Sequence, residues 1–279
     1  MKTFASLSLM AAFAALTFLS SCKKDSVNND TTAVTDNAMA EGESNGILQA
    51  VNSAADDNDV RSDEGLDTIL PPCAVVTIDT SNASKSITID FGSTPCLCSN
   101  WDNKYREGKI TATWTGLYRD SGTVISIQTA DYYVGYNASA LNKFEYLKTV
   151  TNMGHNASGN LHFNINVITA IVTLPSGQLI IWTSVRDREW IAGESTFLPF
   201  DDKYSITGSA SGTDRNGNPF TVTITNPVIV AFLCPWIEQG TLEITHGNFP
   251  TATLDYGDGT CDDQATITIG NTTTTITLP

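Results

Sequence analysis

The sequence has few basic residues and few histidines. Its 279 residues include 15 Lys and Arg against 30 Asp and Glu, a formal net charge of −15. The shortage of bases argues against a nucleic-acid partner, because binding to phosphates needs a basic surface. The only histidines are His155, His162 and His246, and none has a companion at a zinc-binding spacing such as His-Glu-x-x-His. Phosphate-cradling glycine loops are also missing, so we predict no metal ion, no cofactor and no nucleic acid.

Catalytic motifs are equally scarce. The segment Gly208-Ser209-Ala210-Ser211-Gly212 approaches a nucleophile elbow, but its central residue is alanine and it lies in a strand pattern. We therefore assign no catalytic residue and favour a binding or structural module over an enzyme. The alternative is a surface or cell-envelope hydrolase, such as a glycoside hydrolase with two carboxylates across an aromatic-lined cleft. Two facing acids in a concave pocket would favour that alternative.

The first residues have the pattern of a processing signal. Lys2 precedes an uncharged apolar stretch from Phe4 to Leu19, which is too short for a comfortable transmembrane helix. Leu19-Ser20-Ser21-Cys22 follows, and it resembles the lipobox of bacterial lipoproteins. The resemblance implies a signal peptide over residues 1–21, cleavage before Cys22 and acylation of Cys22. The alternative is an ordinary secretory signal with a chance cysteine.

Acylation of Cys22 would make the lipid bilayer the partner of this chain, because several acyl chains hold a protein stably on a membrane. No aspartate follows Cys22 directly, and by resemblance to known sorting rules this predicts the outer membrane. The leaflet that the protein faces stays open.

Residues 22–70 are predicted to be an acidic, disordered, flexible tether. Residues 23–70 contain 11 acids and 3 bases and are poor in aromatics, so they bury too little apolar surface to offset the entropy of ordering. One short amphipathic helix over residues 46–55 is compatible with the apolar spacing. The triplets Asp25-Ser26-Val27, Asp30-Thr31-Thr32 and Asp67-Thr68-Ile69 resemble Bacteroidota O-glycosylation sites, or simply reflect the linker's composition.

Residues 71–279 are predicted to be a single all-β domain. Apolar and polar side chains alternate with a period of two, as expected for half-buried antiparallel strands. Such runs lie at residues 86–91, 109–116, 160–167, 204–211, 220–225 and 265–269. Turn residues separate them, and we count about twelve to fourteen strands and no convincing long helix. An antiparallel twisted meander forming a sandwich, roll or partial barrel satisfies this pattern.

The cysteines indicate an oxidising compartment. Cys22 aside, five remain: Cys73, Cys96, Cys98, Cys234 and Cys261. An exported chain is expected to form disulfides, and five cysteines leave at least one free thiol. Cys96 and Cys98 are too close in sequence for an unstrained bridge. We therefore predict Cys234–Cys261 and a bridge from Cys73 to either Cys96 or Cys98; a metal site at Cys96 and Cys98 is the alternative.

A run of acidic residues offers a second candidate site. Asp255, Asp258, Asp262 and Asp263 surround a glycine-containing turn. Clustered carboxylates on such a turn can bind calcium. The spacing does not match an EF-hand loop, so we favour a solvated acidic turn beside a disulfide.

A third candidate is a strand face rich in tryptophan and arginine. Trp182, Arg186, Arg188 and Trp190 fall on the same face of one long strand. Arginine stacks on indole and binds carboxylates with two hydrogen bonds. This face could therefore bind a sugar ring or an anionic glycan, or it could be a structural ladder neutralised by Asp187, Glu189 or a neighbouring strand.

Several segments together resemble a family of uncharacterised Bacteroidota lipoproteins. They are Cys96-Leu97-Cys98 with Trp101-Asp102 and Arg106-x-Gly108-Lys109-Ile110, Trp114-x-Gly116-x-Tyr118-Arg119-Asp120-x-Gly122, residues 148–154, residues 204–210, and Asp255-Tyr256-Gly257-x-Gly259-x-Cys261. The resemblance covers about residues 71–279 and implies export, lipidation and an all-β domain. It carries no site residue. We expect an outer-membrane lipoprotein with a β-rich binding or structural module for a glycan or another envelope partner.

Overall fold

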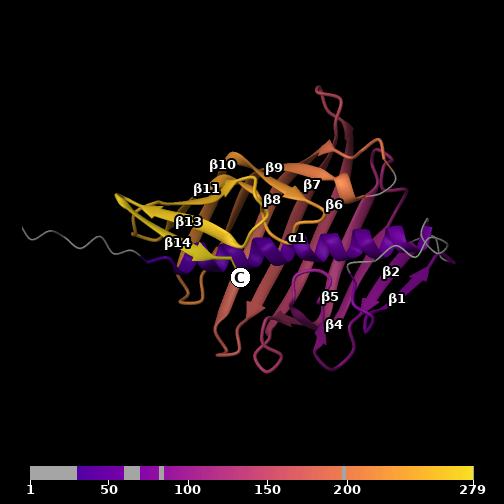
Figure 1. The fold of residues 1–279 in the computed structure, drawn as a ribbon, viewed down its shortest axis with the longest axis horizontal. Helices are drawn as coiled ribbons and strands as arrows, with labels where there is room; N and C mark the ends of the chain where they lie inside the picture. The colour runs from indigo at the N-terminus through magenta and orange to yellow at the C-terminus, as the bar shows by residue number, and fades with distance from the viewer. Residues whose placement is uncertain (1–29, 60–69, 82–84, 197–198, 279) are drawn as a thin grey trace, which may run out of the picture.

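The protein is an all-β structure with one long helix, which confirms the predicted fold class (Figure 1). A computed structural model describes residues 30–59, 70–81, 85–196 and 199–278. The predicted signal peptide and Cys22 lie outside these residues. The elements are α1 (Thr32–Asp59), β1 (Val75–Asp79), β2 (Lys85–Asp90), β3 (Cys96–Leu97), β4 (Tyr105–Trp114), β5 (Val124–Gly135), β6 (Asn142–His155), β7 (Leu161–Thr173), β8 (Leu179–Ala192), η1 (Pro199–Asp201), β9 (Lys203–Thr213), β10 (Pro219–Ala231), β11 (Gln239–His246), β12 (Ala252–Asp258), β13 (Gln264–Ile269) and β14 (Thr272–Thr277).

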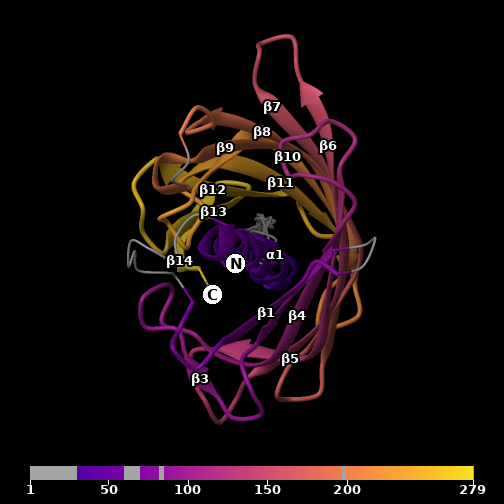
Figure 2. The same ribbon diagram turned by 90° about the vertical axis from the view of Figure 1, so that its right-hand side faces the viewer.

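The strands form one antiparallel sheet of 14 strands. Its order is β1-β2-β4-β5-β6-β7-β8-β9-β10-β11-β12-β13-β14, with β3 pairing to β4 off this path. Neighbours in space are thus neighbours in sequence, which is the predicted meander. The sheet is not closed, because β1 and β14 are its two edges. Figure 2 shows it curled around α1, so the partial barrel is the nearest of the predicted shapes.

The period of two decides which side chains face the interior. Along β7, Leu161, Phe163, Ile165 and Val167 are buried, while the alternate residues are more exposed. The same alternation runs along β2, β8 and β13. Because successive side chains of a strand point to opposite faces, the concave face collects most of the apolar residues and the convex face is the more polar one.

Helix α1 corrects the prediction of a tether over residues 22–70. Its 28 residues lie inside the curled sheet, and contacts reach β2, β4, β8 and β11 (Figures 1 and 2). Ala33, Ile47, Leu48 and Ala54 are each at most 1% exposed. The tether prediction is therefore wrong for residues 32–59, which form a helix, and many of its side chains between Ala33 and Ala54 belong to the core. The predicted short helix over residues 46–55 falls within the second half of α1.

The helix depends on its surroundings more than on its own sequence. At its start, Asp30 Oδ1 accepts a hydrogen bond from the Thr32 N–H, 2.9 Å away, which satisfies one of the unpaired amides of the first turn. Gly42 and Gly46 lie in its interior, and each glycine costs roughly 1 kcal/mol of helix stability relative to alanine. Such a helix is marginal in water, so burial in the sheet stabilises it.

Two disulfides fasten the loops, as predicted. Cys234 pairs with Cys261, and Cys73 pairs with Cys96, with Cα–Cα distances of 5.8 and 6.1 Å. The choice that the sequence left open for Cys73 is thus resolved in favour of Cys96. Cys98 is the remaining thiol among the described cysteines, and it is fully buried. Burial raises its pKa, so it is expected to be an inert side chain.

Candidate functional site

Polar side chains of α1 are matched one by one to the concave face of the sheet. Trp182 Nε1 donates to Asn37 Oδ1 at 2.9 Å. Arg186 donates from Nε and Nη2 to the Glu41 carboxylate at 3.0 and 2.9 Å. These residues are almost completely buried, and a buried carboxylate is tolerated only when a cation and hydrogen bonds compensate it.

Lys148 adds a further contact to the middle of the helix. Its Nζ donates to the Ser44 carbonyl oxygen at 2.8 Å, and the Ser44 hydroxyl contacts the Tyr146 hydroxyl. Burial and the nearby Arg188 hold the pKa of Lys148 well below its ordinary range. The helix is therefore held through a carbonyl as well as through ion pairs.

The predicted ligand face of β8 is covered by these contacts. Trp182, Arg186, Arg188 and Trp190 are 1 to 4% exposed. Arg188 stacks on Tyr204, with its Cζ 3.6 Å from the ring centroid, and Trp190 Nε1 donates to Asp202 at 3.2 Å. The face is a structural ladder that no external ligand reaches in this conformation. Its chief neutralising acid, Glu41, comes from α1 and not from Asp187, Glu189 or a neighbouring strand.

A second ion cluster joins α1 to the start of β4. Arg106 is completely buried and donates from Nη1 and Nη2 to Asp102 at 2.8 and 2.7 Å. Its Nε donates to the Tyr132 hydroxyl, which in turn donates to Glu43 Oε1 at 2.7 Å. Lys104 Nζ lies 3.9 Å from the other Glu43 oxygen. The carboxylates of Asp102 and Glu43 therefore both lie beside the Arg106 guanidinium, and Lys104 adds a second cation.

The environment of the Asp102 carboxyl group leads us to expect a pH-dependent free energy of unfolding. Burial acts to raise its pKa, but the hydrogen bonds and charge of Arg106 outweigh burial, so the pKa lies below the ordinary 3.8. A lowered folded-state pKa contributes stability above about pH 4 that is lost as the pH falls through the folded-state value. We expect Asp102→Asn to cost about 3 kcal/mol at pH 7 and to flatten the acid limb. Urea unfolding from pH 7 to pH 2.5 measures both; an acid limb as steep as in the parent chain would contradict this role.

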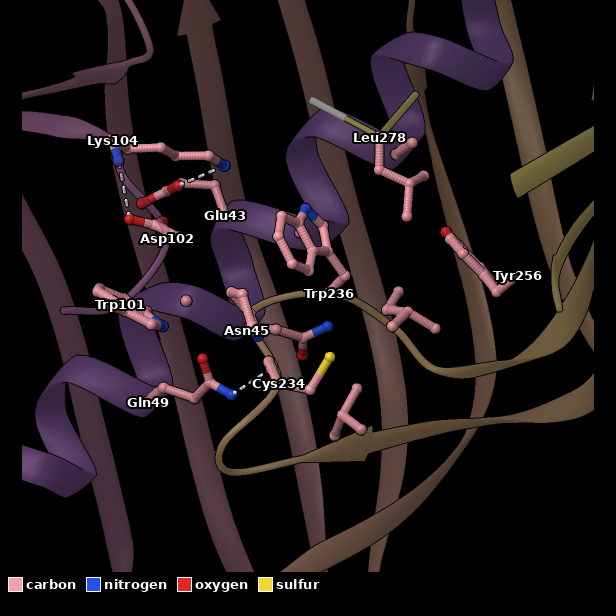
Figure 3. A pocket seen from close by; sticks show the side chains of 16 residues that line it. Glu43, Asn45, Gln49, Trp101, Asp102, Lys104, Cys234, Trp236, Tyr256 and Leu278 are labelled. Atoms are coloured by element: carbon pink, nitrogen blue, oxygen red, sulfur yellow. Dashed lines mark hydrogen bonds and ion pairs between the residues drawn. The ribbon is translucent and has the colours of Figure 1, made fainter. Parts of the chain in front are cut away.

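Beside this cluster lies a cleft between α1 and two loops (Figure 3). Gly42 and Gly46 of α1 border it, with Trp101 from the β3–β4 connection and Trp236 from the β10–β11 connection on its sides. A Cβ added at Gly42 would meet nothing within 4 Å, whereas one at Gly46 would lie 3.5 Å from the Trp101 ring. The absence of a side chain at Gly46 makes room for the Trp101 ring, and its absence at Gly42 leaves the cleft open.

Three residues that line this cleft carry a buried polar atom without a partner in the described part of the chain. The Asn45 amide nitrogen, the Trp101 Nε1 and the Tyr256 hydroxyl are buried and make no hydrogen bond in the described part of the chain. Tyr256 itself is only 3% exposed. Buried polar atoms are normally paired, so three unpaired ones in one cleft indicate a missing partner. The cavity volume is about 30 Å³, which is room for roughly two waters.

The other sequence candidates do not converge on a site. Asp255, Asp258 and Asp262 each accept a backbone N–H two residues further on, as in Asx turns. Of the residues that the structure describes, only Cys234, Glu238 and Cys261 bring three metal-ligating groups within 4.8 Å. The two cysteines of that group form a disulfide and are therefore not thiolate ligands.

The sequence offered one unused signal for the α1 contacts. Arg186 and Arg188 occupy the buried parity of β8, where a cation needs an anionic partner. The acid-rich segment before residue 70 is the obvious source. No comparable signal predicted that Trp101 and Trp236 would meet at one cleft, because loops bring them together.

Comparisons with known proteins leave the site to be interpreted from its geometry. No family model, curated protein or solved structure matches the chain. In the described part of the chain, α1 is too polar, and no other helix is long enough, to be a candidate membrane span.

Proposed function

We propose that the chain is an outer-membrane lipoprotein of the Bacteroidota type, anchored through acylated Cys22, whose curled sheet binds a small polar ligand of the glycan class. The observation that carries the binding proposal is a cleft lined by Trp101 and Trp236, three of whose lining residues carry a buried polar atom without a partner in the described part of the chain. Sugar rings offer apolar faces to indoles and hydroxyl groups to such donors.

The charges around the cleft favour a neutral or weakly polar ligand over a strongly charged one. Glu43, Asp102 and Lys104 line it, but they already contact one another or Arg106. A hydroxyl-rich ligand could pair with Asn45 and Tyr256 without breaking these ion pairs. Since the present volume is smaller than a sugar ring, we expect the half-buried Trp236 to move outward on binding.

Hydrolysis of a glycosidic bond fits the cleft less well. Glu43 and Asp102 are the two carboxylates that line it. A glycosidase keeps one of its two carboxyl groups protonated as the general acid. Arg106 keeps the pKa of Asp102 low, and both oxygens of Glu43 already face Tyr132, Lys104 or Arg106. The geometry therefore supports binding.

A pair of substitutions at Gly42 tests the binding proposal. Gly42→Leu is expected to fill the cleft and to reduce the retention of glycans on an array at least tenfold. Gly42→Ala is the matched control, because its Cβ meets nothing within 4 Å and alanine favours a helix by roughly 1 kcal/mol. We expect it to keep binding and to be slightly more stable. Absence of any retained glycan with the parent chain, or equal binding by both variants, would refute the site.

The anchor is tested separately. Cys22→Ser is expected to release the protein from the membrane fraction, because no thiol remains there for acylation. Mass spectrometry of the mature amino terminus checks the modification directly. A mature terminus at another residue, without acyl chains, would refute the lipoprotein proposal while leaving the cleft unaffected.

A further inference from the structure

Helix α1 begins at one particular end of the sheet. Asp36 accepts hydrogen bonds from the backbone N and the Nε of Arg215, in the β9–β10 turn, at 2.8 and 2.7 Å. Asp30, at the start of the described chain, lies close enough to His246 at the end of β11 for its pKa to be lowered, after the larger effect of its hydrogen bonds with Thr32. The chain therefore enters the domain between these two strand ends.

Because the sheet is an antiparallel meander, every second connection lies at this same end. We call it the helix-start end; its connections are residues 91–104, which include β3, and residues 136–141, 174–178, 214–218, 247–251 and 270–271. Two of these connections, residues 174–178 and 214–218, are in direct contact, since Gln178 Nε2 donates to the Arg215 carbonyl oxygen at 3.3 Å. The opposite end carries residues 115–123, 156–160, 193–202, 232–238 and 259–263.

The two ends differ in charge. The connections of the helix-start end contain four charged residues, Asp102, Lys104, Asp214 and Arg215, and both of these carboxylates are buried. The opposite end exposes Asp120, Asp201 and Asp262. In a chain of net charge −15, an end whose connections expose no carboxylate is the one that an anionic lipid surface repels least.

Apolar side chains are exposed beside the same turns. Leu179 and Ile181, at the start of β8, are 50% and 43% exposed on the convex face. Ile181 pairs with Thr213, the residue before the β9–β10 turn. These aliphatic side chains therefore lie close to the point where α1 begins, and they have no cover within the described part of the chain.

We propose that the helix-start end rests against the lipid bilayer, with Leu179 and Ile181 in the headgroup region. The inference rests on the proposed acylation of Cys22. Seven residues lie between Cys22 and Asp30, and the eight Cα–Cα steps from one to the other span roughly 30 Å at most. The anchor therefore holds this end near the membrane, and the aliphatic side chains add binding in proportion to their buried area.

Two matched probes test the orientation. Ser176 and Ser158 are exposed residues of comparable hairpin turns, each followed by a glycine with positive φ, at opposite ends of the sheet. Ser176→Cys and Ser158→Cys variants of the acylated full chain are labelled with a fluorophore, since Cys98 is buried. The proteins are placed in phospholipid vesicles that contain a spin-labelled headgroup lipid. We expect at least fivefold stronger quenching at position 176 than at position 158.

The outcomes separate this inference from the anchor. Failure of the protein to float with vesicles overturns both proposals. Flotation with equal quenching, stronger quenching at position 158 or no quenching overturns the orientation alone. A shielded probe at position 176 in the absence of lipid would assign this end to a second copy of the chain, which also overturns it.

A second pair of variants tests the aliphatic residues. The double substitution Leu179→Ser with Ile181→Ser is expected to lower quenching at position 176 by at least twofold. Val185→Ser is the control, because Val185 is 53% exposed on the same face of β8 but lies roughly 13 Å further along the strand from Ile181. If the double substitution and Val185→Ser lowered the quenching equally, the proposed contact of Leu179 and Ile181 with the headgroup region would be wrong.

Discussion

Replacing Arg186 with methionine is expected to lower the free energy of unfolding by about 3–5 kcal/mol, because it leaves the Glu41 carboxylate buried without a cation. Glu41 and Arg186 are both 4% exposed and are joined by two hydrogen bonds. Removal of one partner of such a pair costs far more than the pair itself contributes. Urea unfolding at pH 7, followed by tryptophan fluorescence, measures the change.

Two controls make the Arg186 result specific. Lys109→Met removes a cation from the exposed pair with Asp90 on the surface, where the expected cost is below about 1 kcal/mol. The double variant Glu41→Met with Arg186→Met removes both charges and is expected to recover most of the lost stability. If Arg186→Met were as mild as Lys109→Met, α1 would not be packed against β8 as described.

A chain that begins at residue 60 is expected not to fold cooperatively, which is the largest effect that the structure predicts. Without α1, the concave face would expose Arg106, Lys148 and Arg186 together with the apolar residues that the helix covers. Sheets with an uncovered apolar face do not form a stable core. Thermal melting by near-ultraviolet circular dichroism distinguishes a folded chain from an unfolded or molten one.

The matched control is a chain that begins at residue 30. It removes the proposed signal peptide, Cys22 and the residues up to 29 but keeps α1 and Asp30. We expect its melting transition to coincide with that of a chain that begins at residue 22. A cooperative transition for the chain from residue 60, at a similar temperature, would show that α1 is dispensable and would restore the tether interpretation.

The strands could be predicted from the sequence because their signal is local. Residues 160–167 and 204–211 alternate polar and apolar side chains, and the structure places them in β7 and β9. Nearest-neighbour pairing along the chain then follows from short turns. The Cys234–Cys261 pair was also predicted correctly, although the spacing of Cys96 and Cys98 excludes only a bridge between those two cysteines.

The helix could not be predicted as a core element because its polar residues have distant partners. Asn37 and Glu41 look like solvated side chains, yet their partners Trp182 and Arg186 lie 145 residues further along. Its apolar residues also do not gather on one face, since the sheet surrounds it. The composition of a segment indicates how much apolar surface that segment can bury by itself. It carries no information on complementary charges elsewhere in the chain.

The cleft was missed for a related reason. Trp101 and Trp236 lie in separate loops whose conformations depend on the two disulfides and on the contact of Gln49 with the Ala231 and Cys234 carbonyl oxygens. The face chosen instead, around Trp182 and Trp190, has the right residue types. That face points into the interior. The alternation along β8 indicates this once it is known that the even-numbered residues are the buried ones.

Amide hydrogen exchange of α1 tests most directly the claim that this acidic segment is the centre of the fold. We expect the amides of residues 44–54 to be protected as long as those of β7, because opening either requires unfolding the sheet around the helix. The experiment uses the full mature chain at pH 7, with peptides from α1 and β7 followed by mass spectrometry. Exchange of the α1 amides within seconds, while β7 stays protected, would contradict the account.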